Sequence, residues 1–214
     1  MKKKNNRNLY ASVSLLAAFV FWTIAVCSVD VRAIGPQGSS VGFAAINALI
    51  HKLTGVHMRL YHITDWLGLV PVFVALGFAF LGLVQWITRK KLRKVDHSIL
   101  LLGGFYLAVM AVYVLFETVS VNYRPVLIGG NLETSYPSST TLLVLCVMPT
   151  AILQLNSRIQ NTVLKKLLSR LLMAFVLFMV GGRLVSGVHW FTDIVGGVLL
   201  SAGLVRMYRY FVKE

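Results

Sequence analysis

Long apolar runs without charged residues constrain the fold of this chain more than any other feature. Residues 9–29, 66–87 and 99–116 each approach the roughly 20 residues that an α-helix needs to cross the hydrocarbon core of a bilayer. Of the 214 residues, 57% are hydrophobic and only 13% are charged, against about 25% charged in an average soluble domain. This composition excludes a soluble globular domain, a disordered chain and a disulfide scaffold.

Three shorter runs complete a predicted set of six spans. Residues 139–155 contain Pro149, which a membrane helix tolerates when neighbouring groups satisfy the freed carbonyl. Residues 171–182 and 194–205 are short uncharged cores, and alone each would be typical of a buried helix or a re-entrant segment. We therefore expect an all-α, polytopic membrane bundle of about six transmembrane helices, forming one integral membrane domain over residues 1–214.

The excess of basic residues, 21 Lys and Arg against 7 Asp and Glu, is explained by topology. Most of them lie before the first predicted span or directly after the second, fourth and sixth, which is one side of a six-span protein. The positive-inside rule then places both termini, including a basic tail at residues 1–8, in the cytoplasm. We expect a bacterial plasma-membrane protein, and the net charge of +14 needs no nucleic-acid partner.

The connection at residues 32–65 is predicted to lie on the outer side. Its apolar residues recur at helical spacing between a cap at Ser39 or Ser40 and a terminating Gly55, which predicts an amphipathic helix in the membrane interface. Three aromatic residues are typical of the outer aromatic belt, namely Tyr61, Trp66 and Trp190.

Three polar clusters at the outer ends of the spans, residues 122–125, 136–141 and 183–193, are candidate functional sites. Ionisable groups at membrane depth are costly, and they are functional candidates by default. His189 and Asp193 are four residues apart, so on a helix they would share a face. A carboxylate at this offset can fix the imidazole tautomer and leave the other ring nitrogen free as a nucleophile or base.

The other two clusters supply groups that bind anions. Ser138, Ser139 and Thr140 follow a proline at the start of a predicted helix, where hydroxyl and backbone N–H groups favour an anion. Arg124 and Arg183 add two planar guanidinium forks. Together with an oriented histidine, these residues predict a phosphate-transfer pocket.

Each feature also has an ordinary structural interpretation. A Ser/Thr run before an apolar stretch is often only a helix N-cap, and a lone arginine near a membrane often contacts headgroups or sets topology. Glu117 and Glu133 could be solvated. The remaining outer histidines are typical of an interfacial loop, and they are His51, His57 and His62.

These motifs resemble the type 2 phosphatidic-acid phosphatase family, the membrane lipid phosphate phosphatases. That family carries three blocks: Lys-x6-Arg-Pro, Pro-Ser-x-His and Ser-Arg-x5-His-x3-Asp. The third block matches at Arg183, His189 and Asp193. Block order, block spacing and the six-span layout agree as well, so the resemblance covers most of the chain from about residue 66 onward.

The first two blocks depart from the family pattern. The first keeps Arg124-Pro125, but Glu117 stands where the family has Lys. The second keeps residues 137–139, but Thr140 stands where the family has His. Thr140 cannot replace that histidine as proton donor near neutral pH, because a hydroxyl is a very weak acid.

The resemblance implies a role for each matching residue. His189 would attack phosphorus and form a phosphohistidine, and Asp193 would orient it. The phosphoryl oxygens would be held by Arg124, Arg183, Ser138 and Ser139. No metal or other cofactor is expected.

The sequence thus favours a phosphatase that acts on a lipid phosphate or diphosphate at the outer face of the membrane. It leaves His57, His62, Glu117 and Glu133 as alternative proton donors. The main alternative is a non-catalytic member that binds a lipid phosphate headgroup, since two of the three blocks have lost a residue. A transporter is less favoured, because no repeated half is visible.

Overall fold

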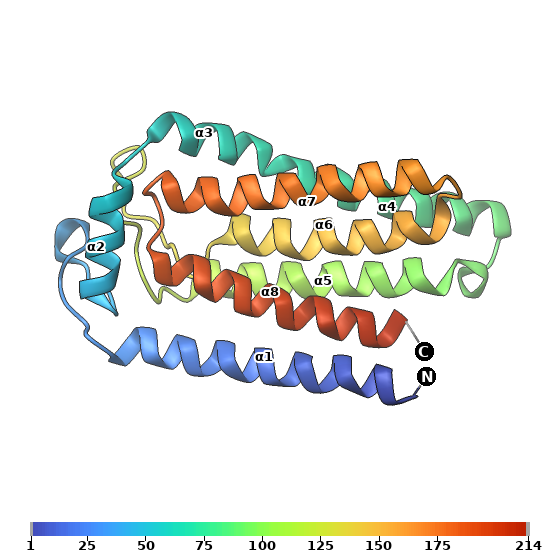
Figure 1. Ribbon diagram of the computed structural model, residues 1–214, viewed down its shortest axis with the longest axis horizontal. Helices are drawn as coiled ribbons and strands as arrows, with labels where there is room; N and C mark the ends of the chain where they lie inside the picture. Colours follow the sequence, from blue (N-terminus) through green and yellow to red (C-terminus); the bar gives the residue numbers. More distant parts are fainter. Residues whose placement is uncertain (1, 213–214) are drawn as a thin grey trace.

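The structure is a computed structural model that describes residues 2–212, with side chains from residue 6 onward. It is an all-α bundle in which the long helices run roughly parallel to one another (Figure 1). The α-helices are α1 (Lys2–Ser28), α2 (Ala44–Thr54), α3 (Met58–Leu67), α4 (Leu69–Arg89), α5 (His97–Thr118), α6 (Ser139–Arg158), α7 (Thr162–Val185) and α8 (Phe191–Val212).

Within the described residues, five helical segments are long and apolar enough to cross a membrane. They are Asn6–Ser28, Met58–Arg89, His97–Thr118, Ser139–Arg158 and Phe191–Val212. The predicted all-α membrane bundle is therefore confirmed. The predicted span at residues 171–182 lies within α7, which is not in this set, although its 24 residues pack along α6.

The chain reverses direction so that its two ends meet. The start of α1 and the end of α8 lie together at one end of the bundle, which we call the terminal end (Figure 1). Helix α2 and the connection between α5 and α6 lie at the opposite end, which we call the loop end. This arrangement agrees with an even number of crossings. Helix α1 includes residues 2–8 of the predicted basic tail. Residue 1 and the side chains of residues 2–5 lie outside the described part of the chain.

Helices α6 and α8 form the centre of the bundle. Just over half of each apolar window is buried, 56% in both helices, whereas the window that covers α4 is 6% buried. Large apolar side chains on the outer helices face outward instead, for example Phe21 on α1, Phe80 on α4 and Leu107 on α5. An apolar outer surface of this extent suits the hydrocarbon core of a bilayer.

A polar network ties the helices together at the terminal end. Asp96, directly before α5, forms ion pairs with Arg89 at 2.8 Å and with Arg158 at 3.4 Å. Gln85 donates to the Asp96 carboxylate at 2.8 Å. The hydrogen bond from Arg89 holds the pKa of Asp96 below its usual range. These contacts join α4, α5 and α6 at the end opposite to the predicted site.

The outer connection differs from the prediction in two respects. Helix α2 begins at Ala44, so neither Ser39 nor Ser40 caps it. The cap comes instead from Asp30, whose carboxylate accepts a hydrogen bond from the backbone N–H of Ala45 at 2.8 Å. A second helix, α3, which the sequence analysis did not predict, follows at Met58–Leu67 and leads through Gly68 into α4.

Candidate active site

His189 lies at the loop end, in the turn between α7 and α8, and is 3% exposed. Gly187 makes this turn possible. It has a φ of +67°, and a Cβ there would fall 1.9 Å from the carbonyl oxygen of Gly55. The backbone at the end of α2 therefore packs directly against the turn that carries His189, and only glycine fits at position 187.

Asp193 approaches His189 differently from the prediction. The two residues do not share a helix face, because α8 begins at Phe191 and His189 precedes it. Asp193 lies in the first turn, where its Oδ2 accepts a hydrogen bond from the backbone N–H of Trp190 at 2.9 Å, in the manner of a capping box. The same Oδ2 lies 3.6 Å from Nδ1 of His189, slightly beyond hydrogen-bond distance.

A second polar group fixes the other Asp193 oxygen. Nδ2 of Asn122 donates to Oδ1 of Asp193 at 3.3 Å. The backbone oxygen of Asp193 accepts from the N–H of Ser138 at 3.1 Å. Asp193 thus holds the start of α8 to the α5–α6 connection and to the start of α6.

Arg124 contacts the other nitrogen of the histidine. Its Nη1 lies 3.5 Å from Nε2 of His189, and its Nε forms an ion pair with Glu133 at 3.0 Å. A guanidinium can only donate, so Nε2 is the accepting nitrogen and the imidazole proton belongs on Nδ1, toward Asp193. This is the tautomer that leaves Nε2 free to attack an electrophile.

Arg183, in the last turn of α7, is almost fully buried. Its Nη2 forms an ion pair with Asp65 at 3.4 Å, and its Nη1 donates to Oγ1 of Thr64 at 3.5 Å. Its Nε is buried and has no hydrogen-bond partner among the described residues. Native structures rarely leave a buried donor unsatisfied, so this N–H is available to a ligand.

Tyr61 joins the two arginines. The guanidinium carbons of Arg183 and Arg124 lie 5.0 Å and 5.8 Å from the centroid of its ring, within cation–π distance. Tyr61 is buried, so the prediction that it belongs to an aromatic belt is wrong. Trp190 is buried as well, and its Nε1 donates to the carbonyl of Tyr123 at 2.8 Å. The sequence around Tyr61 and Trp190 does not predict these contacts, because an aromatic residue near the end of a span is typical of an aromatic belt.

The start of α6 uses its hydroxyl groups unevenly. The Ser138 hydroxyl acts as the N-cap and accepts from Oγ1 of Thr141 at 3.0 Å and from the N–H of Thr141 at 3.5 Å. Ser139 lines a cavity that His189 also lines. The methyl group of Thr140 faces Gly68, at the junction of α3 and α4, and Thr140 does not line this cavity.

The cavity beside His189 is small, about 10 Å³, which is room for about one water molecule. A phosphoryl group therefore enters only when the lining moves apart. The lining comes from the end of α5, the α5–α6 connection, the start of α6 and the histidine turn, and consists of Tyr113, Phe116, Glu117, Thr134, Ser135, Tyr136, Pro137, Ser139, Leu142 and His189.

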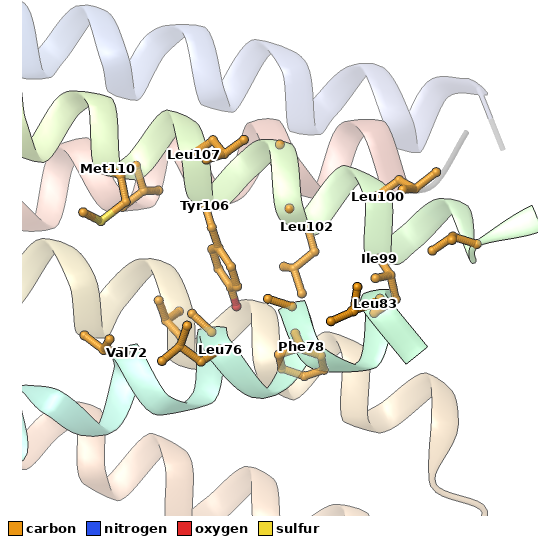
Figure 2. Close-up of a pocket in the computed structure, with 18 of the residues that line it drawn as sticks. Val72, Leu76, Phe78, Leu83, Ile99, Leu100, Leu102, Tyr106, Leu107 and Met110 are labelled. Carbon is orange, nitrogen blue, oxygen red and sulfur yellow. The ribbon is translucent and has the colours of Figure 1, made fainter. Parts of the chain in front are cut away.

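A much larger cavity of about 670 Å³ opens between α4, α5 and α6. Its lining is almost entirely apolar, and Figure 2 shows Leu76 of α4 and Leu102 and Tyr106 of α5 along it. Met110 lines the outer part of this cavity, and Tyr113, one helical turn further along α5, lines the small cavity beside His189. The two cavities are therefore lined by successive turns of α5.

The environment of His189 favours a neutral imidazole. Burial lowers the pKa of His189 well below its usual range, and the positive charges of Arg124 and Arg183 lower it further. A neutral imidazole near neutral pH is a nucleophile, whereas a protonated one is not.

Comparison with known proteins agrees with this geometry. The family model of the PAP2 superfamily matches residues 117–214. This match covers a little under half of the chain. It contains Arg124, Arg183, His189 and Asp193, so the predicted relationship to type 2 phosphatidic-acid phosphatases is confirmed.

The whole chain has the fold of a solved PAP2 structure, the first transmembrane PAP2 type phosphatidylglycerolphosphate phosphatase from Bacillus subtilis. The two chains are 19% identical, with a TM-score of 0.63, and the match covers 95% of this chain and 96% of that chain. No curated protein matches this chain. The family match over residues 117–214 and this shared fold both agree with the predicted resemblance.

The neutral state of His189 can be measured directly. With ¹⁵N-labelled histidine in detergent, the His189 resonances should remain those of a neutral ring with its proton on Nδ1 at pH 6, because burial and two guanidiniums oppose protonation. His189→Gln assigns the resonances by removing them. A titration of His189 with a midpoint at or above about 6.5, the ordinary histidine value, would contradict the electrostatic account.

Proposed function

We propose that the chain hydrolyses a lipid phosphate or diphosphate through a phosphohistidine at His189. The observation that carries this proposal is what lies next to each of the two ring nitrogens. Nε2 meets Arg124 at 3.5 Å, and Nδ1 faces Asp193 at 3.6 Å. The buried imidazole of His189, as the proposed nucleophile, therefore lies between a carboxylate that can orient it and a guanidinium that can bind phosphate.

The first half of the reaction is attack on phosphorus. In the proposal, Nε2 of His189 forms the P–N bond while the P–O bond to the leaving group breaks. The phosphorylated ring becomes cationic with its proton on Nδ1, and the Asp193 carboxylate stabilises this cation. Arg124 and the unsatisfied Nε of Arg183 bind the phosphoryl oxygens, whose negative charge favours two guanidiniums.

The second half is hydrolysis of the P–N bond by water, which returns the lone pair to Nε2 of His189. The backbone N–H groups at the start of α6, near Ser139, add partial positive charge where the phosphoryl group would lie. The hydroxyl of Ser138 has a smaller part in this scheme than the sequence suggested, because it caps α6.

We place the site at the outer face and both termini in the cytoplasm. The positive-inside rule supports this orientation, since the basic connections before α5 and before α7 follow the second and fourth predicted spans. The site lies at the loop end, opposite the terminal end (Figure 1).

The substrate's apolar chain would lie in the 670 Å³ cavity between α4 and α5. Its apolar lining and its approach toward the small cavity along Met110 and Tyr113 support this placement. A lipid could then remain in the bilayer while its phosphate reaches His189.

Filling this cavity should lower activity on long-chain substrates. Gly103 lines the cavity, and a Cβ added there meets no atom within 4 Å. Gly103→Leu should therefore fold and fill part of the space proposed for the lipid chain. We expect a KM several-fold higher for a long-chain lipid phosphate and little change for a short-chain analogue. Gly77→Leu is the matched control, because Gly77 is equally open but does not line the cavity. Equal effects of both variants would argue against this chain site.

The proposed activity is tested by phosphate release in detergent. Wild-type protein should release phosphate from phosphatidic acid or a polyprenyl diphosphate, and His189→Ala should abolish release because it removes the nucleophile. His97→Ala, the same change at the terminal end, should leave the rate unchanged. Phosphate release that persists in His189→Ala would exclude His189 as nucleophile.

The second candidate function is a protein that binds a lipid phosphate without hydrolysing it. The small size of the cavity and the replacement of the family's lysine and histidine by Glu117 and Thr140 favour it. Tight lipid-phosphate binding without turnover, together with no gain of turnover in Thr140→His, would favour the binder over the enzyme.

A further inference from the structure

Three carboxylates surround the site besides Asp193, and two of them are neutralised by arginine. Asp65 forms an ion pair with Arg183 at 3.4 Å, and Glu133 forms one with Arg124 at 3.0 Å. Neither Asp65 nor Glu133 lines the small cavity beside His189. Their contact with the site runs through the two arginines.

Glu117 is held differently. Its Oε2 accepts a hydrogen bond from the hydroxyl of Thr134 at 3.4 Å, and within residues 6–212 no ion pair includes it. It projects from the last turn of α5 and lines the same small cavity as His189. Of the three carboxylates, Glu117 is thus the one that lines the small cavity beside His189 and forms no ion pair with an arginine among the described residues.

The other candidate proton donors do not reach this cavity. Thr140 faces Gly68 and lies outside the lining. Nε2 of His57 contacts the backbone oxygen of Thr54 at 2.8 Å, and His57 and His62 are both exposed away from the lining.

We propose that Glu117 carries the proton to the leaving oxygen and later takes one from the attacking water. This inference rests on the proposed phosphatase function and deepens it. It also gives a use to the residue that stands where the resembling family has lysine. The site would move its proton from the end of α5 instead of from the start of α6.

The proton that Glu117 would move comes from the substrate. A bound phosphate monoester in its singly charged form carries one proton on a phosphoryl oxygen. As Nε2 of His189 bonds to phosphorus and the P–O bond breaks, the Glu117 carboxylate accepts that proton and passes it to the leaving alkoxide, which departs as the alcohol. In the second step Glu117 removes a proton from water as its oxygen bonds to phosphorus, and the P–N bond electrons return to Nε2. Inorganic phosphate leaves and the Glu117 proton passes to it or to solvent.

A diphosphate makes this transfer less important. Its leaving group is a phosphate, which is a far weaker base than an alkoxide and departs without a proton from the protein. The dependence on Glu117 should therefore follow the leaving group, whereas a residue with a purely structural role would affect both substrates alike.

The test compares Glu117→Gln with wild type on two substrates in detergent. The amide keeps the shape and an acceptor for Thr134 but cannot relay a proton. We expect a loss of roughly 10²- to 10⁴-fold on phosphatidic acid and a much smaller loss on a polyprenyl diphosphate. Glu133→Gln is the matched control, since removing the Arg124 partner should change both substrates to a similar extent.

Each outcome is decisive. Equal losses on the two substrates, or no loss on phosphatidic acid, would overturn the role of Glu117 while leaving the phosphatase function intact. Absence of phosphate release by wild type from both substrates would overturn the function and this inference together. If Glu117→Gln unfolds below the wild-type temperature, Glu117→Asp replaces it, and its loss should again be larger for phosphatidic acid.

Discussion

The buried carboxylate of Asp193 is the interaction on which the site depends. Its side chain accepts hydrogen bonds from the Trp190 backbone and from Asn122, and its backbone oxygen accepts one from Ser138. These bonds join the start of α8 to the α5–α6 connection and to the start of α6. His189 and Arg124 lie on the segments so joined, so these bonds hold the histidine turn and the arginine next to each other.

The two arginines of the candidate site are already in ion pairs with carboxylates. Both arginines already have carboxylate partners in Asp65 and Glu133, and both lie over the ring of Tyr61. A phosphoryl group must therefore compete with these partners or bind beside them. Among the described residues Glu117 is in no ion pair, and the proposed relay uses this carboxylate.

Much of the fold could be predicted from the sequence, because membrane spans are long runs of uncharged, apolar residues. The parts that were missed depend on contacts distant in the chain. Helix α3 mixes Arg59 and Asp65 with apolar residues and so resembles a loop, and its partnership with Arg183 spans 118 positions. The His189–Asp193 offset indicated proximity correctly, but by a turn and a helix start instead of a shared helix face. The motif residues were found because the spacing of the third block is specific, whereas Tyr61 had no local pattern to distinguish it from an interfacial aromatic residue.

The most direct test of the central claim, that neutral His189 attacks phosphorus, is to trap the intermediate. Wild-type protein mixed with a lipid phosphate and quenched rapidly in alkali, which preserves phosphohistidine, should carry one phosphoryl group on the peptide that contains His189. Asp193→Asn should reduce the amount trapped, because the cationic ring loses its counter-charge. A phosphoryl group on a different residue, or hydrolysis at full rate with no phosphorylated protein at any time, would contradict the account.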